Sequence, residues 1–179
     1  MKSAITLLLF LAASAFAQDT ARVQAQSACG PLDVQFDAQA AAGEPVAQPA
    51  PGKALVYVAE EFRKAPGELG NPTLRVGMDG TWLGATREST YLAFNVEPGE
   101  HHLCSSWQSH LRTLSKLAAF AGFTAEAGKT YYFRERITYS SYGGAGGATA
   151  MNLDLEAVNP DEGQFLVASY KPSASHPKK

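Results

Sequence analysis

Apolar and polar residues alternate with a period of two along several stretches between residues 53 and 157, the pattern of half-buried strands in an antiparallel sheet. In one stretch Leu92, Phe94 and Val96 fall on the same face, and in another Leu74 and Val76 do so. Residues 53–61 form a more continuous apolar run, which favours a central strand. The hydrophobic pattern therefore predicts a chain built mainly from strands.

Turn residues separate these strands at short intervals. Asp79-Gly80 lies between two strand-like runs, and this dipeptide suits a type I′ hairpin turn, which needs a positive φ at both central residues. Pro98-Gly99 marks a second turn. The sequence predicts an all-β, mainly antiparallel fold, a single β-sandwich of about seven to nine strands.

One short helix is expected after the last strand. Asn159 can cap it, Pro160 suits its first position, and Glu162 can complete a capping box. A final strand over residues 164–170 is the alternative. Pro172 would end the element, and residues 172–179 are expected to form a disordered tail.

The segment that contains both turns resembles the PEGA pattern. It has a strand, an Asp-Gly turn, and then an apolar strand that ends in Pro98-Gly-Glu-His101. With the apolar run before it and Ala127-Gly-Lys-Thr-Tyr-Tyr132 after it, residues 53–171 are similar to the bacterial domain-of-unknown-function family 2846. This resemblance implies a secreted β-sandwich and supplies no catalytic residues.

The N-terminus has the pattern of a secretory signal peptide over residues 1–17. Lys2 precedes an apolar stretch, and Ala15-Phe16-Ala17 forms an A-x-A cleavage site before Gln18. The stretch is shorter than a membrane span of about 20 residues, although an anchor helix is the alternative. We expect a bacterial protein that is periplasmic or secreted and, after cleavage, not stably inserted in the membrane. Residues 18–52 are expected to form an N-terminal segment that ends in an Ala/Pro-rich linker.

Cys29 and Cys104 are the only cysteines, and an even number in an exported chain favours a disulfide. Two free thiols are the alternative. A bridge would close a loop of about 75 residues, a stabilisation of roughly 4 kcal/mol in the chain-entropy model. Cys104 shares a strand face with His102 and Ser106, so the bridge would fasten residues 29–36 to the less apolar face of the sheet.

Charge and motif spacing argue against several functions. The net charge of −2 provides no basic field for nucleic acid or anionic lipid. His101 and His102 point to opposite faces of their strand, and we expect both to be solvated on an edge strand rather than bound to a metal. No spacing typical of a metal site, a nucleotide loop or a serine nucleophile is present, so we expect no cofactor and no catalytic residue.

Aromatic residues are the better candidates for binding, because such rings stack on sugars or anchor protein partners. They are Trp82, Trp107, Tyr132 and Tyr142, although Trp82 beside a tight turn could also cover its neighbouring strand. We expect non-catalytic binding of an envelope protein or glycan. A purely structural domain is one alternative. The other is a carboxylate-dependent hydrolase built around Glu135, which lies on the apolar face of its strand.

Overall fold

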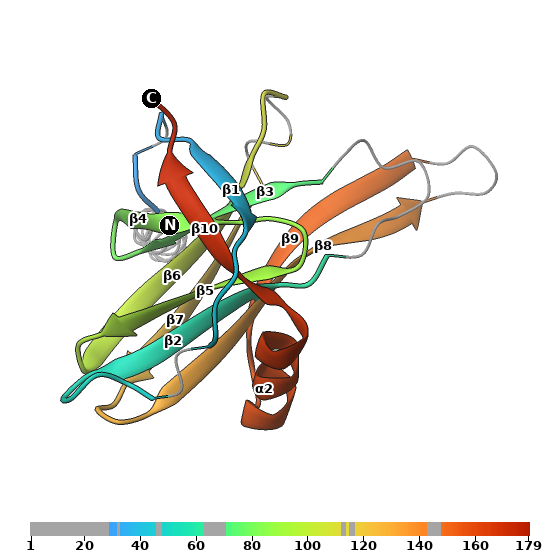
Figure 1. Ribbon diagram of the computed structural model, residues 1–179. Coiled ribbons are helices and arrows are strands. Elements are labelled where there is room, and N and C mark those ends of the chain that lie inside the picture. The colour runs from blue at the N-terminus through green and yellow to red at the C-terminus, as the bar shows by residue number, and fades with distance from the viewer. Residues whose placement is uncertain are drawn as a thin grey trace, which may run out of the picture.

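A computed structural model, shown in Figure 1, describes residues 29–31, 33–45, 48–62, 71–111, 114, 117–142 and 148–179. The predicted signal peptide, residues 1–17, lies outside the described residues. Within the described ranges the chain forms ten strands and the helix α2. No helix there is long and apolar enough to cross a membrane.

The strands form two sheets. The six-stranded sheet has the order β1-β10-β5-β2-β8-β9, and the four-stranded sheet has the order β4-β3-β6-β7. The strands of the larger sheet are β1 (Phe36–Ala40), β2 (Ala54–Glu60), β5 (Thr90–Val96), β8 (Thr130–Tyr142), β9 (Ala148–Val158) and β10 (Lys171–Pro177). Those of the smaller sheet are β3 (Thr73–Met78), β4 (Thr81–Thr86), β6 (Gly99–Gln108) and β7 (Ala118–Ala125).

The structure confirms a β-rich, mainly antiparallel fold and corrects its details. There are ten strands instead of seven to nine, and the six-stranded sheet is mixed. β2 pairs in parallel with β8, and β10 pairs in parallel with β5. Periodicity indicates which face of a strand is buried but not which strand lies beside it, so these parallel pairs could not be predicted.

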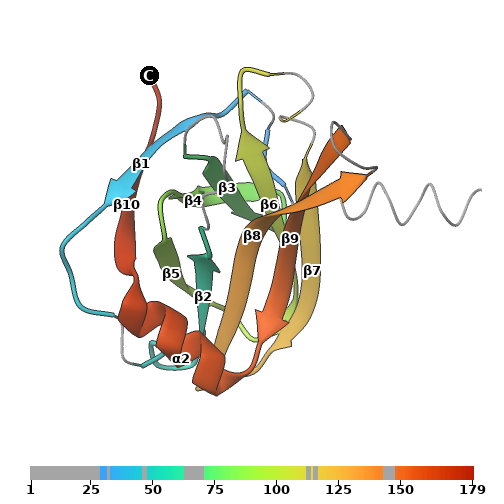
Figure 2. The ribbon, with the colours of Figure 1, turned by 90° about the vertical axis from the view of Figure 1, so that its right-hand side faces the viewer.

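The main core lies between the two sheets, which face each other in Figure 2. Val56 and Val58 of β2 and Phe133 of β8 meet Val76 of β3 and Leu103 of β6 there. Leu92, Phe94 and Val96 pack into the same core, as the alternation predicted. The hairpin turn is confirmed as well, because Asp79 and Gly80 both have positive φ, at 51° and 84°.

Helix α2 (Pro160–Ser169) covers the other face of the six-stranded sheet. It begins as predicted, with the side chain of Asn159 accepting a hydrogen bond from the backbone N–H of Glu162. Leu166 and Val167 bury their side chains in a second cluster with Tyr57 and Tyr91. A helix therefore forms here, and not the alternative strand.

Residues 171–177 form β10, not the disordered tail that we expected. This strand pairs with β1 over five residues and extends the six-stranded sheet. The hydroxyls of Ser173 and Ser175 bond the carbonyl and the N–H of Ala85 in β4. Short polar residues that suggested a frayed end thus serve as hydrogen-bonding partners between the sheets.

Candidate functional site

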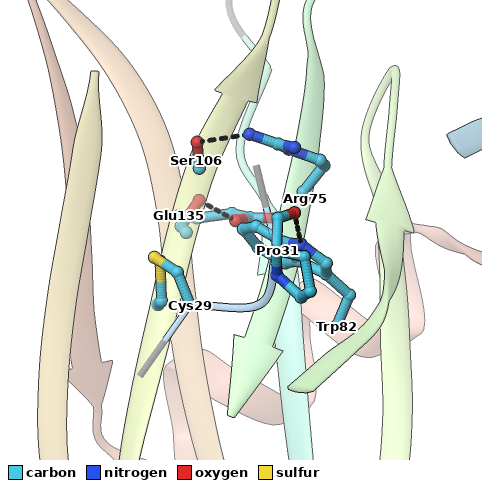
Figure 3. The surroundings of a disulfide bond; sticks show 8 residues. Cys29, Pro31, Arg75, Trp82, Ser106 and Glu135 are labelled. Carbon is cyan, nitrogen blue, oxygen red and sulfur yellow. Dashed lines mark hydrogen bonds between the residues drawn. A yellow bond between two sulfur atoms is a disulfide. The ribbon is translucent and has the colours of Figure 1, made fainter. Parts of the chain in front are cut away.

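The outer face of the four-stranded sheet carries the predicted disulfide. Cys29 is bonded to Cys104 of β6, with 5.2 Å between the Cα atoms (Figure 3). The alternation along β6 turns Leu103 into the core between the sheets and Cys104 to the opposite face. The bridge therefore fastens the N-terminal segment to the outside of this sheet, as the sequence predicted.

Trp82 holds the same segment from β4. Its indole Nε1–H donates to the carbonyl of Pro31 at 2.7 Å, and the ring lies against Gly30. A Cβ added at Gly30 would come within 2.3 Å of the indole Cδ1, so glycine permits this close approach. The guanidinium of Arg75 lies 4.4 Å from the ring centroid. Trp82 therefore covers its neighbouring strand and the segment above it.

Arg75 links three parts of this face. It lies on β3 and donates to the carbonyl of Val34 at 2.7 Å and to the hydroxyl of Ser106 at 3.1 Å. Burial lowers the pKa of Arg75, and the guanidinium keeps its charge because arginine titrates far above neutral pH. Gln108 exchanges two hydrogen bonds with the backbone of Phe36, at 2.6 and 2.8 Å. The segment is thus held at several points along its length.

The outer face of the four-stranded sheet continues from the disulfide onto β7. No other described part of the chain covers it there. Four alternating residues of β7 are exposed, namely Ala118, Phe120, Gly122 and Thr124. None of them is charged, and the side chain of Phe120 is 39% exposed. Phe120 pairs with Cys104, so its ring lies next to the bridge. We call these four residues the β7 face.

Two glutamates are buried between the sheets. Glu60 on β2 and Glu135 on β8 are register partners, so their side chains point to the same side. Both oxygens of Glu135 accept hydrogen bonds from hydroxyls of the opposite sheet, one from Thr86 and one from Ser105. Burial raises the pKa of Glu135 to about 7, although these two hydrogen bonds act in the other direction.

Glu60 is as deeply buried, with only 1% of its surface exposed. Its carboxyl oxygens have no hydrogen-bond partner in the part of the chain that the structure describes. Burial raises the pKa of Glu60 well above its usual range, the charge of Glu135 raises it further, and the nearby Thr86 hydroxyl opposes the shift. Burial therefore favours the protonated form of both carboxyls.

Other carboxylates are bound in ion pairs on the outer side of the six-stranded sheet. Arg134 on β8 bonds Glu156 at 2.6 Å and also pairs with Glu162 in the first turn of α2. The same guanidinium lies 3.6 Å from Glu61, at the end of β2. These ion pairs link β2, β8, β9 and the helix, so the acids have a structural role.

His101 is not the solvated edge residue that we expected. It lies on β6, an inner strand of the four-stranded sheet, and its Nδ1 is 2.6 Å from Asp79 while its Nε2 is 2.8 Å from the carbonyl of Glu97. Burial acts to lower the pKa of His101, but the bonds to Asp79 and Glu97 outweigh it, and the pKa lies above the usual value. The ring thus joins two adjacent turns.

Three of the predicted binding aromatics, Trp82, Trp107 and Tyr132, lie on different faces of the two sheets. Trp107 is half-buried on the face of β6 that carries Leu103, and Tyr132 lies beneath α2 on the far side of the larger sheet. Tyr132 stacks on Tyr57 with ring centroids 5.4 Å apart. Tyr142 ends β8, but its side chain lies outside the described residues.

Sequence reasoning missed two features of this region. Phe120 was not singled out, since both faces of residues 117–125 are apolar and the pattern does not show which one is covered. The pairing of Glu60 with Glu135 was missed because it depends on a parallel register. In the described ranges, no group of three or more His, Cys, Asp or Glu side chains could hold a metal ion.

Comparisons of the sequence with models of protein families and with curated proteins find no match. The resemblance to the domain-of-unknown-function family 2846 therefore stays a prediction from the quoted motifs.

Proposed function

We propose that the mature chain is an exported, non-catalytic β-sandwich module that binds an envelope protein through the β7 face. The observation that carries this proposal is the exposed, uncharged set of Ala118, Phe120, Gly122 and Thr124 beside the disulfide. A solvated sheet face normally carries polar residues. Interface centres are instead depleted of charge and enriched in aromatic side chains such as phenylalanine.

The disulfide supports export, because such bonds form and persist in oxidising compartments. A place in the periplasm or outside the cell follows if the predicted signal peptide is cleaved. The bridge also bears on binding, since it fixes the strand next to Phe120 in a rigid sheet. A rigid face loses less conformational entropy when a partner binds to it.

The position of the carboxyl pair supports a non-catalytic role over the hydrolase alternative. A hydrolase needs at least one acid that reaches the substrate, yet Glu135 is 0% exposed and Glu60 is 1% exposed. Both carboxyl oxygens of Glu135 also accept hydrogen bonds, one from Thr86 and one from Ser105. The ion-paired acids around Arg134 are likewise committed to other contacts.

A protein partner fits the β7 face better than a glycan does. Sugar binding relies on open aromatic rings flanked by hydrogen-bonding groups. Trp82 and Tyr132 are both committed to packing, and Phe120 has mainly small side chains along its own strand. An uncharged strand face with one phenylalanine among small residues suits contact with another protein.

Site-specific photo-crosslinking tests the proposal. A photoreactive phenylalanine analogue replaces Phe120 in one sample and Phe165 in the control, because Phe165 is 70% exposed on α2, away from the β7 face. With envelope extract of the producing bacterium, we expect one discrete protein adduct at position 120 and none at 165. Excess wild-type protein should remove the adduct, whereas excess Gly122→Arg protein should not. A Cβ at Gly122 meets only ordinary contacts, the nearest atom at 3.5 Å, so this variant should fold.

The other outcomes would reject the proposal. Equal labelling at both positions means nonspecific capture. If the protein is retained on purified cell-wall glycan and Phe120→Glu abolishes that retention, the ligand is a glycan and not a protein. No adduct at either position, with a correctly folded protein, would favour the purely structural domain.

A further inference from the structure

The strands β1 and β10 border a cavity that is separate from the β7 face. It has a volume of about 360 Å³, within the range of small-molecule sites, and lies along the β1–β10 ladder near the beginning of β3 and the end of β4. The side chains that matter to the argument are Asp37, Gln39, Thr73, Arg87, His176 and Lys178. Figure 1 shows β1 and β10 side by side at this end of the molecule.

The charge of this lining contrasts with that of the whole chain. The chain has a net charge of −2, yet Arg87, Lys178 and His176 line the cavity, and Asp37 is the one acid among the described residues of the lining. Asp37 and His176 are register partners on β1 and β10. Positive charge gathered in a concave surface of an acidic protein favours a negatively charged ligand.

The acids near these cations do not neutralise them fully. Lys178 lies 3.4 Å from Asp37, whose side chain is 78% exposed, and such exposed pairs contribute little. Arg87 lies 3.5 Å from Glu88 through its Nε. Glu88 also accepts a hydrogen bond from Asn71. In the described part of the chain the two terminal nitrogens of Arg87 have no hydrogen-bond partner, which leaves a fork that suits two oxygens of one anion.

We propose that this cavity binds a small oxyanion, a carboxylate or a phosphate, with Arg87 as the bidentate donor and Lys178 as the second cation. The amide of Gln39 and the hydroxyl of Thr73 supply neutral hydrogen-bonding groups on the lining. The ladder gives the site a rigid wall, because β1 and β10 pair over five residues. This proposal does not depend on the β7 face.

Titration of the isotope-labelled protein with inorganic phosphate, and separately with succinate, tests the site by NMR. We expect saturable shifts of the Arg87 side-chain N–H and of backbone amides in β1 and β10, with at least one of the two anions. The two titrations distinguish the phosphate class from the carboxylate class. Sodium chloride at equal ionic strength is the reference for simple screening.

Three variants make the result decisive. Arg87→Ala should weaken binding at least tenfold, because the bidentate contact is lost. Asp37→Asn should tighten binding, because it removes a negative charge from the lining that repels an anion. Lys53→Gln, a change in an exposed lysine paired with Glu97, should leave binding unchanged. The spectrum of each variant shows that it is folded.

Two results would overturn the proposal. One is the absence of local shifts with both anions in the folded wild-type protein. The other is weak binding that Lys53→Gln reduces as much as Arg87→Ala does, which would mean general attraction to surface cations.

Discussion

Glu60 and Glu135 lie opposite each other on the parallel strands β2 and β8, with both carboxyl groups buried between the sheets. Glu135 is held by two hydroxyls, and Glu60 has no hydrogen-bond partner in the described ranges. The raised pKa of each means that the folded state binds more protons than the unfolded state does. The pair therefore destabilises the fold once both carboxyls must ionise.

The free energy of unfolding should consequently fall as pH rises above the unfolded pKa of about 4.5 and through the folded pKa of Glu135 at about 7. For Glu135 alone the loss is on the order of 3 kcal/mol. Glu60→Gln removes one of the two charges, so it should stabilise the protein at about pH 8 and have little effect near pH 4. Urea unfolding across this range measures both effects. Glu100→Gln, the same substitution at an exposed position of β6, is the matched control.

The disulfide should contribute about 4 kcal/mol to stability, since it closes a loop with a sequence separation of 75. Cys29→Ser should lower the free energy of unfolding by that amount, as measured in urea. Reductant should lower the stability of the wild-type protein to the same extent and leave the variant unaffected. Equal stability of the oxidised and reduced wild-type protein would contradict the prediction.

Gly163→Ala should destabilise the protein, although alanine normally favours helices. A Cβ at this position would lie 2.1 Å from Cγ of Tyr132, so α2 must move off the sheet or Tyr132 must leave its stack on Tyr57. We expect a loss of about 1–3 kcal/mol in thermal or urea unfolding. Gln164→Ala, at an exposed position on the same helix, should be neutral or slightly stabilising.

The pKa of His101 should lie above its usual value of 6.5 in a histidine NMR titration, because Asp79 stabilises the protonated ring. This contribution to stability is complete below pH 6.5 and is lost as pH rises through the folded pKa. Asp79→Asn should lower the pKa of His101 while it preserves the turn, since asparagine also accepts the positive φ of 51° found there.

Local chemistry allowed several elements to be predicted from the sequence. The hairpin at Asp79-Gly80, the helix that Asn159 caps, and the inward faces of β3 and β5 all depend on neighbouring residues alone. The disulfide was predictable because only two cysteines exist and Cys104 lies on the outward face of an alternating strand.

Features that depend on contacts between distant residues could not be predicted. β10 is short and polar, and it becomes a strand through its partners β1 and β5 and through the serines that bond Ala85. Trp82 was a candidate for binding because aromatic rings can anchor partners, but Gly30 and Pro31, about 50 residues earlier, lie against its ring. The cavity along the β1–β10 ladder likewise combines residues from both ends of the described chain.

The pairing of β1 with β10 has a consequence for the order of folding. These are the first and last strands of the described chain, so their ladder closes a loop that contains every other described element. Contacts between such distant segments carry a large loop-closure cost and slow folding. The bond from Cys29 to Cys104 can form before β7 to β10 take their places, and it shortens the path that separates β1 from β10. Oxidation should therefore accelerate the closing step of folding as well as stabilise its product.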